Sequence, residues 1–249
     1  MILAAGRGER MRPLTDACPK PLLAAGGKPL IVWHIERLRD AGFDEIVINH
    51  AHLGAMIEAA LGDGRQFGAH LRYSAEADAL ETAGGIRQAL PLLGDAPFLV
   101  VNGDVFCDID VAALRHTGES LAPAGDLALL AMVANPPHHP AGDFRLDAGR
   151  LARDGGPRLT FSGLGVYHPS LFAEIAPGAK APLAPLLRTA MDAGKVGGVL
   201  HTGYWLDVGT PARLAELDRR LRSASGAAPA ERAGRTPVEP GKQQPGPRR

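Results

Sequence analysis

The sequence has little of what marks several protein classes. Two cysteines among 249 residues are too few for a disulfide framework, so a reducing compartment, the cytoplasm, is expected. The 27 basic and 27 acidic residues cancel, whereas a nucleic-acid-binding protein carries a basic excess. Apolar runs fall short of the roughly 20 residues that a membrane-spanning helix needs. These absences predict a cytoplasmic protein that binds neither nucleic acid nor a membrane.

Glycine and proline, by contrast, are abundant, with 31 and 21 residues. Their combined share is roughly twice that of an average protein. Part of this surplus lies in residues 223–249, which contain no aromatic residue, Leu, Ile or Met to build a core. We therefore expect one domain over residues 1–222, followed by a disordered tail over residues 223–249.

The rest of the surplus separates segments with the apolar periodicity of strands and helices. In the first 104 residues, the expected strands are 1–6, 45–50, 70–75 and 98–101, and the expected helices are 29–41, 53–61 and 83–93. In the second half, the expected strands are 127–134, 158–167 and 196–201, with a hairpin over 144–151 and helices over 183–191 and 211–221. This alternation predicts an α/β fold in which helices cover both faces of a parallel sheet.

A glycine-rich turn with cationic neighbours follows the first expected strand. Gly6 and Gly8 would let backbone N–H groups approach a phosphate closely, and guanidinium and ammonium groups pair well with its charge. The basic residues of this segment are Arg7, Arg10, Arg12 and Lys20. The pattern favours polyphosphate binding over an ordinary strand-to-helix turn.

Two acidic residues occupy positions suited to a metal ion. Asp104 follows a buried strand, and ligand crevices in α/β proteins lie beyond the carboxyl ends of their strands. Asp207 lies between large apolar residues, just before a helix for which Thr210 is the expected N-cap. Mg²⁺ takes a few carboxylates together with water and substrate phosphates. The alternative for Asp104 is the cap of a turn, and for Asp207 an acid at a helix start.

A third group of polar residues suits recognition of a base. Glu76 ends a strand, and its carboxylate is able to accept from the imide N–H of uracil or thymine, or from N1–H of guanine. Glu81 and Thr82 open a helix beside Gly84, whose exposed backbone would complete the contact with the base edge. The alternative for Glu76 is a solvated acid at a strand end. His138 and His139, in a proline-rich segment, are expected to lie in a surface loop.

Three motifs together resemble the sugar-1-phosphate nucleotidyltransferases. They are LAAGRGERMRPLT followed by PKPL, VNGD around Asp104, and WLDVGTP around Asp207. The resemblance implies a Rossmann-like, mixed and mainly parallel sheet sandwiched by helices. It also implies an enzyme that binds a nucleoside triphosphate through its glycine-rich loop.

The resemblance also assigns roles to individual residues. Arg10, Lys20 and Asp104 would be catalytic, with Asp104 and Asp207 holding Mg²⁺. The nucleotide would contact Leu3, Ala4, Ala5, Gly6, Gly8, Glu9, Arg10, Lys20, Asn49, Glu76, Glu81, Thr82 and Gly84. Asn102 and Gly163 would contact the sugar, and Lys180 would reach a phosphate or carboxylate.

Within this family, segments such as INHAHLG, ALETAGGIRQALPLLG and GLGVYHPSLF are most similar to the uridylyltransferases that act on N-acetylmuramate-1-phosphate. These make UDP-N-acetylmuramate and pyrophosphate from UTP in a cell-wall sugar recycling route. The segment 180–185 lacks the acid that thymidylyltransferases place on the sugar hydroxyls. The alternatives are transfer of a guanylyl group to mannose-1-phosphate, transfer to another hexose-1-phosphate, and a regulatory subunit that only binds nucleotide sugars. A monomer is expected, with a first strand shorter than in relatives.

Overall fold

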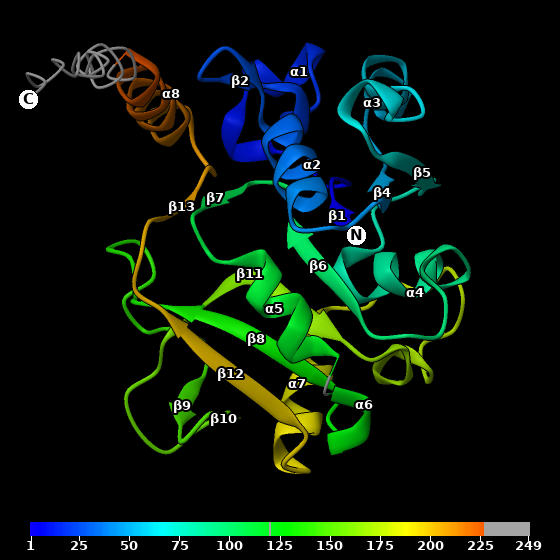
Figure 1. Ribbon diagram of the computed structural model, residues 1–249, viewed down its shortest axis with the longest axis vertical. Helices are drawn as coiled ribbons and strands as arrows, with labels where there is room; N and C mark the ends of the chain where they lie inside the picture. The colour runs from blue at the N-terminus through cyan, green and yellow to red at the C-terminus, as the bar shows by residue number, and fades with distance from the viewer. Residues whose placement is uncertain (120, 227–249) are drawn as a thin grey trace, which may run out of the picture.

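The computed structural model describes residues 1–119 and 121–226, in which a nine-stranded sheet forms the centre of the molecule (Figure 1). Its strands are β1 (Ile2–Leu3), β4 (Glu45–His50), β5 (His70–Ala75), β6 (Phe98–Asn102), β8 (Ala128–Val133), β9 (Arg145–Asp147), β10 (Arg150–Ala152), β11 (Thr160–Tyr167) and β12 (Val196–His201). Two small sheets pair β2 (Ala24–Ala25) with β3 (Lys28–Pro29) and β7 (Val105–Cys107) with β13 (Trp205–Asp207).

The helices follow the strands along the chain. They are α1 (Leu14–Ala17), α2 (Leu30–Asp40), α3 (Gly54–Leu61), α4 (Glu81–Leu93), α5 (Val111–Gly118), α6 (Leu121–Ala124), α7 (Leu183–Asp192) and α8 (Pro211–Gly226). Short 3-10 turns are η1 (Glu9–Met11), η2 (Lys20–Leu22), η3 (Arg65–Phe67) and η4 (Pro169–Phe172). No helix of the described residues is long and apolar enough to cross a membrane.

The strand order of the large sheet is β5-β4-β1-β6-β11-β8-β12-β10-β9. The four strands from the first half of the chain run parallel, and β11 enters antiparallel between β6 and β8. Strands β8 and β12 are again parallel to each other. The expected α/β fold with a mixed, mainly parallel sheet is therefore confirmed.

Helices cover both faces of this sheet because its central strands are apolar on both sides. In β4, Ile46 and Ile48 pack in one buried cluster with side chains of α2, α3 and α5. Val47, which points to the opposite face, packs in a second cluster with side chains of α4 and α7. The same alternation holds in β6, where Leu99 and Val101 belong to the first cluster. Such two-sided burial explains why these strands read as continuous apolar runs in the sequence.

A third, smaller cluster joins the two ends of the described chain. Met11 and Leu23 from the N-terminal segment pack with Leu217 and Leu221 of α8. The carboxylate of Asp218 accepts a hydrogen bond of 2.8 Å from the backbone N–H of Gly26. Helix α8 therefore lies beside β2, although nearly two hundred residues separate them in the sequence (Figure 1).

Several elements differ from the sequence-based expectation. Strand β1 is only two residues long, and α8 ends at Gly226 instead of residue 221, so the expected domain boundary at 222 falls inside a helix. Residues 227–249, most of the expected tail, lie outside the described residues. Strands β7 and β13 and helix α5 were not expected. The first two form only by pairing with each other across about a hundred residues, which local patterning does not reveal.

Candidate functional site: two cavities that share Asp104

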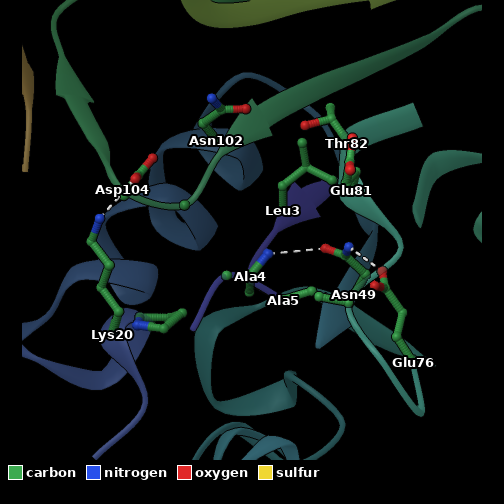
Figure 2. Close-up of a pocket in the computed structure, with 14 residues that line it drawn as sticks. Leu3, Ala4, Ala5, Lys20, Asn49, Glu76, Glu81, Thr82, Asn102 and Asp104 are labelled. Carbon is green, nitrogen blue, oxygen red and sulfur yellow. Dashed lines mark hydrogen bonds and ion pairs between the residues drawn. The ribbon is translucent and has the colours of Figure 1, made fainter. Parts of the chain in front are cut away.

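The ends of the parallel strands surround a cavity of about 220 Å³. The chain reaches it after β1, β4, β5 and β6, at the carboxyl edge of the sheet where ligand crevices form in α/β proteins. Its lining includes most residues predicted to bind a nucleotide (Figure 2). These are Leu3, Ala4, Ala5, Gly6, Lys20, Asn49, Glu76, Glu81 and Thr82, with Asn102 and Asp104 at one side.

Gly6 and Gly103 shape this cavity in different ways. A Cβ added at Gly6 would meet no atom within 4 Å, so the missing side chain leaves open space in the cavity wall. A Cβ at Gly103 would lie 2.6 Å from the carbonyl oxygen of Leu3. The ends of β1 and β6 approach this closely because residue 103 has no side chain, and Asp104 is thereby directed to the cavity.

Lys20 and Asp104 form an ion pair at the border of the cavity (Figure 2). Lys20 Nζ lies 2.7 Å from Asp104 Oδ2, although 84 residues separate them. The lysine side chain is only 10% exposed, whereas that of Asp104 is 37% exposed. A buried ammonium group next to an accessible carboxylate is suited to pair with phosphate oxygens that enter the cavity.

Glu76 is buried, and both of its carboxylate oxygens are used within the protein. Asn49 Nδ2 donates to Oε1 at 2.6 Å, and the backbone N–H of Leu80 donates to Oε2 at 2.8 Å. Asn49 Oδ1 in turn accepts from the backbone N–H of Ala4 at 2.9 Å (Figure 2). The network joins the end of β4 to the segments that follow β1 and β5. The alternative of a solvated acid is therefore wrong for Glu76, which forms part of the cavity wall.

The start of α4 closes the same cavity. Glu81 has a φ of 61°, a left-handed conformation that is uncommon outside glycine and that concentrates at functional sites. Gly84 does not line the cavity. Its N–H donates to the carbonyl of Ala181 at 3.1 Å. A Cβ at Gly84 would lie 2.4 Å from the carbonyl oxygen of Ala179. Gly84 thus allows α4 to pack against this backbone.

A second cavity, of about 360 Å³, adjoins the first and shares Asn102 and Asp104 with it. Gly163, predicted to bind sugar, lies in this lining with a φ of 83°. A Cβ at Gly163 would lie 2.8 Å from Asn102 Nδ2, so the absence of a side chain at residue 163 leaves room for the side chain of Asn102. The register of β11 shifts between Phe161 and Gly165, which turns the glycine away from the regular ladder.

Asp207 also lines the second cavity, and the small β7–β13 sheet sets its position. Asp207 is paired with Val105 in this sheet, and the N–H of Val208 donates to the carbonyl of Asp104 at 2.7 Å. The two acids predicted to bind a metal are therefore brought to one cavity. The side chain of Asp207 lies 3.3 Å from Arg213 Nη2 and 3.5 Å from His138 Nε2.

The structure also shows cavity residues that the sequence did not identify. His138 and His139 lie in a loop, as expected, but this loop forms part of the second cavity. Trp205 lines it as well, and its indole N–H donates to the carbonyl of Ser162 at 2.8 Å. Arg213, in the first turn of α8, lies 3.3 Å from Asp207. In the sequence, only the WLDVGTP motif, which ends just before Arg213, pointed to this part of the cavity wall.

Of the remaining residues predicted to bind a ligand, one lines a cavity and three do not. Arg10 lines the second cavity and has no hydrogen bond or ion pair within the described part of the chain, so its guanidinium is free for a ligand. Gly8, Glu9 and Lys180 line neither cavity. Glu9 faces Arg7 and Arg12 at 3.8 and 3.5 Å, and Lys180 is exposed.

Asp104 and Asp207 provide the donor atoms that Mg²⁺ prefers. Among the described residues, no group of three or more His, Cys, Asp and Glu side chains forms a self-sufficient metal site. Magnesium ions in phosphate-transfer sites are held by only one or two carboxylates, and the substrate phosphates and water complete the coordination. The two carboxylates beside one cavity therefore fit a metal ion that arrives with a nucleotide.

Behind Asp104, α2 buries a titratable side chain. His34 is fully enclosed, and this burial lowers the pKa of its imidazole to about 4. Hydrogen bonds with the backbone of Gly103 and Val105 act in the opposite direction but are weaker. A neutral His34 therefore supports the loop that carries Asp104.

Comparison with known proteins gives a consistent result. Residues 1–147 match the Nucleotidyl transferase family. The chain is 60% identical, over 87% of its length and 95% of the relative, to an N-acetylmuramate alpha-1-phosphate uridylyltransferase of Neisseria meningitidis serogroup B. It is 34% identical, over 90% of its length and 97% of the relative, to a protein of the same name from Caulobacter vibrioides.

Solved structures share the fold at low sequence identity. A putative glucose-1-phosphate thymidylyltransferase from Bacillus anthracis superposes with a TM-score of 0.78 at 20% identity, covering 89% of this chain and 94% of that one. A UDP-glucose pyrophosphorylase complexed with UDP-glucose gives a TM-score of 0.70 at 20% identity, covering 90% and 97%.

Proposed function

The chain belongs to the nucleotidyl transferase family, and we propose that it makes UDP-N-acetylmuramate and pyrophosphate from UTP and N-acetylmuramate-1-phosphate. The observation that carries the reaction class is the position of the Lys20–Asp104 pair, where the two cavities meet. A nucleotide in the first cavity and a sugar phosphate in the second would bring their phosphates together at this pair. The choice of substrates rests on the relative that is 60% identical.

The nucleotide would enter the cavity formed by the glycine-rich loop and the start of α4. Gly6 leaves room for the phosphates, and the buried Glu76–Asn49 network forms the wall on which the base would rest. Arg10, which has no partner among the described residues, would bind the outgoing pyrophosphate. Asn102 and Gly163 would contact the sugar in the second cavity.

The reaction needs positioning and charge compensation more than proton transfer. The phosphate oxygen of the sugar attacks the α-phosphorus of UTP, and the bond from this phosphorus to the bridging oxygen of pyrophosphate breaks. The attacking group is already an anion, so no general base is required. Lys20 would stabilise the charge on the phosphoryl oxygens, and it does so from a largely buried position where such interactions are strong.

Asp104 and Asp207 would hold Mg²⁺. When bound, the ion would supply charge neutralisation between the triphosphate and the incoming phosphate. Asp104, the more exposed partner of the Lys20 ion pair, would be one of the two carboxylates that hold the ion, and Lys20 would bind phosphate oxygens beside it. In the same proposal, the protein is a cytoplasmic monomer that serves recycling of cell-wall sugars. Its two cysteines, Cys18 and Cys107, are unpaired, which suits a reducing compartment.

The test is pyrophosphate release with each of the four nucleoside triphosphates and a set of sugar-1-phosphates. We expect turnover to be fastest with UTP and N-acetylmuramate-1-phosphate, and to require Mg²⁺. Preference for GTP and mannose-1-phosphate, or for another hexose-1-phosphate, would contradict the substrate assignment. Absence of turnover with every pair would favour a regulatory subunit that binds nucleotide sugars.

The variant Asp104→Ala tests the assignment of the metal-binding acid. Loss of this carboxylate should lower kcat by roughly 100-fold or more, because the charge of the reacting phosphates is no longer compensated. The matched control is Asp95→Ala, which removes an exposed carboxylate before β6, at the opposite end of that strand from Asp104. Both variants should remain folded, although Asp104→Ala should melt earlier because Lys20 loses its partner, and thermal melts check this. An Asp104→Ala protein with near-normal turnover at saturating Mg²⁺ would disprove the role.

A further inference from the structure

A third cavity, of about 490 Å³, adjoins the second on the side away from the nucleotide. The two cavities share Pro136, His138 and Trp205 in their linings. The residues that line only the third cavity come from the end of β8, the loop before β13 and the first turns of α8. A ligand in the second cavity with an additional substituent thus has space for it beyond His138 and Trp205.

Arg213 is the cationic residue of this additional space. Its side chain is 15% exposed and lines the third cavity. Nη1 lies 2.8 Å from His138 Nε2, and Nη2 lies 3.3 Å from Asp207 Oδ2. The buried Nε atom has no hydrogen-bond partner within the described residues. Each Nη group carries two N–H donors, of which these contacts use one, so the guanidinium has donors left for a carboxylate in the third cavity.

A second guanidinium group, that of Arg10, lies near Arg213 and Asp207. A Cβ at Gly209 would lie 2.6 Å from Arg213 Nη2, 2.8 Å from Arg10 Nη2 and 2.9 Å from Asp207 Oδ1. Both guanidinium groups therefore lie near Asp207, but only that of Arg213 is within ion-pair distance of its carboxylate. The acid that lines the third cavity is Glu216, which is exposed, whereas Asp207 lines the second. His201 lies 2.8 Å from Asp108 and is already paired.

We propose that the third cavity is the subsite for the acidic substituent of the sugar, and that Arg213 binds its carboxylate. This inference rests on the proposed function, because N-acetylmuramate differs from N-acetylglucosamine by a lactyl ether that ends in a carboxylate. The phosphate of the sugar is directed to Asp104 and Lys20, and the lactyl group extends past His138 and Trp205. Lys180, expected from the sequence to reach a phosphate or carboxylate, is exposed and lines none of these three cavities.

The experiment compares two substrates that differ only in the lactyl group. N-acetylmuramate-1-phosphate and N-acetylglucosamine-1-phosphate are assayed with UTP, and the ratio of their kcat/KM values is the readout. The variant Arg213→Met keeps the length of the side chain and removes its charge. We expect it to lower the ratio by about 10- to 100-fold, the loss typical of a charge-assisted hydrogen bond.

Two further variants define the cause. Arg213→Lys keeps the charge but cannot form a bidentate pair of hydrogen bonds, so its ratio should lie between those of the wild type and Arg213→Met. Arg188→Met removes an exposed arginine on α7 and should leave the ratio unchanged. Thermal melts of all three variants show whether the fold is intact, and the ratio is independent of the amount of active enzyme.

The outcomes separate this inference from the proposed function. An equal fall in kcat/KM with both substrates, which leaves the ratio unchanged, would mean that Arg213 acts only by holding Asp207. No fall with either substrate would mean that Arg213 does not contact the sugar. Either result, with a wild type that prefers the lactyl-bearing sugar, overturns the subsite alone. A wild type that turns over other sugar phosphates but not N-acetylmuramate-1-phosphate overturns the proposed function and the subsite together.

Discussion

Gly6 and Gly103 show how one residue type serves two purposes at a phosphate site. Gly6 borders open space, and a methyl group there would touch no protein atom. Gly103 borders the backbone of β1, and a methyl group there would collide with the carbonyl of Leu3. We therefore expect the first glycine to be needed for ligand binding, whereas the second is needed for the packing of the strands. This distinction is invisible in the sequence, where both follow a short apolar strand.

Replacing these glycines by alanine should separate binding from stability. In Gly6→Ala, the methyl group occupies space in the nucleotide cavity, so KM for UTP should rise by about tenfold, the effect of roughly 1.4 kcal/mol of lost binding. Its melting temperature should stay at that of the wild type. In Gly103→Ala, the contact of 2.6 Å forces the strands apart, and the melting temperature should fall. Steady-state kinetics and thermal melts measure both effects. A Gly6→Ala protein that melts as early as Gly103→Ala would contradict the assignment.

At the scale of elements, the local sequence pattern predicted the bounds of those strands and helices whose own residues carry the signal for burial and for their ends. The strands Glu45–His50, His70–Ala75 and Val196–His201 have the predicted bounds. Each is a short segment with glycine or polar residues close to both of its ends. Helix α2, with an apolar stripe and Gly42 just beyond it, lies within one residue of its predicted ends. For such segments, neighbouring residues in the sequence determine both which side chains are buried and where the helix or strand ends.

The same approach failed for elements that depend on distant partners. Strands β7 and β13 have three residues each and exist because they pair with one another. The position of Asp207 beside Asp104 is a consequence of this pairing, so the sequence suggested each acid separately and joined the two only through a family resemblance. The roles of His138 and Arg213 follow from the same long-range contact, and no local pattern marks them.

Helix α5 was also missed, although it carries an ordinary capping signal. The side chain of Asp110 accepts a hydrogen bond of 2.9 Å from the N–H of Ala113 at the helix start. Asp110→Ala should lower the free energy of unfolding by about 1 kcal/mol, the usual value of an N-cap. Turnover should not change, since α5 contributes no residue to the cavities. Urea unfolding of this variant beside Glu119→Ala, which alters an exposed side chain at the other end, measures the effect. Equal stabilities of the two variants would show that the cap is unimportant.

The molecule as a whole combines a rigid sheet with an active-site edge built from its two ends. Helices α2, α3 and α5 cover one face, and α4 and α7 the other, so the parallel strands cannot shift without disturbing two buried clusters. The N-terminal loop and α8 form a third cluster that packs Met11, beside Arg10, against Leu217, in the helix of Arg213. The two guanidiniums near Asp207 are therefore brought together by contacts between sequence-distant parts of the chain.

His34 lies within this framework and links the stability of the whole molecule to pH. Burial lowers its pKa from 6.5 to about 4 in the folded protein. Between these two values, the unfolded chain takes up a proton that the folded protein rejects, so the free energy of unfolding falls as the pH falls. The stabilisation is present above pH 6.5 and is lost progressively towards pH 4. Between pH 7 and pH 5, the loss from this residue should be about 2 kcal/mol.

The variant His34→Gln removes this contribution and keeps a polar side chain. Compared with the wild type, its free energy of unfolding should fall by about 2 kcal/mol less between pH 7 and pH 5. His116→Gln is the matched control, because His116 is exposed on α5 and should leave the pH dependence unchanged. Urea unfolding without Mg²⁺ or UTP avoids stabilisation by ligands. An NMR titration of the wild-type imidazole gives the pKa directly and does not depend on the variant folding. A titration midpoint near 6.5, or parallel stability curves for wild type and His34→Gln, would show that His34 is not kept neutral by burial.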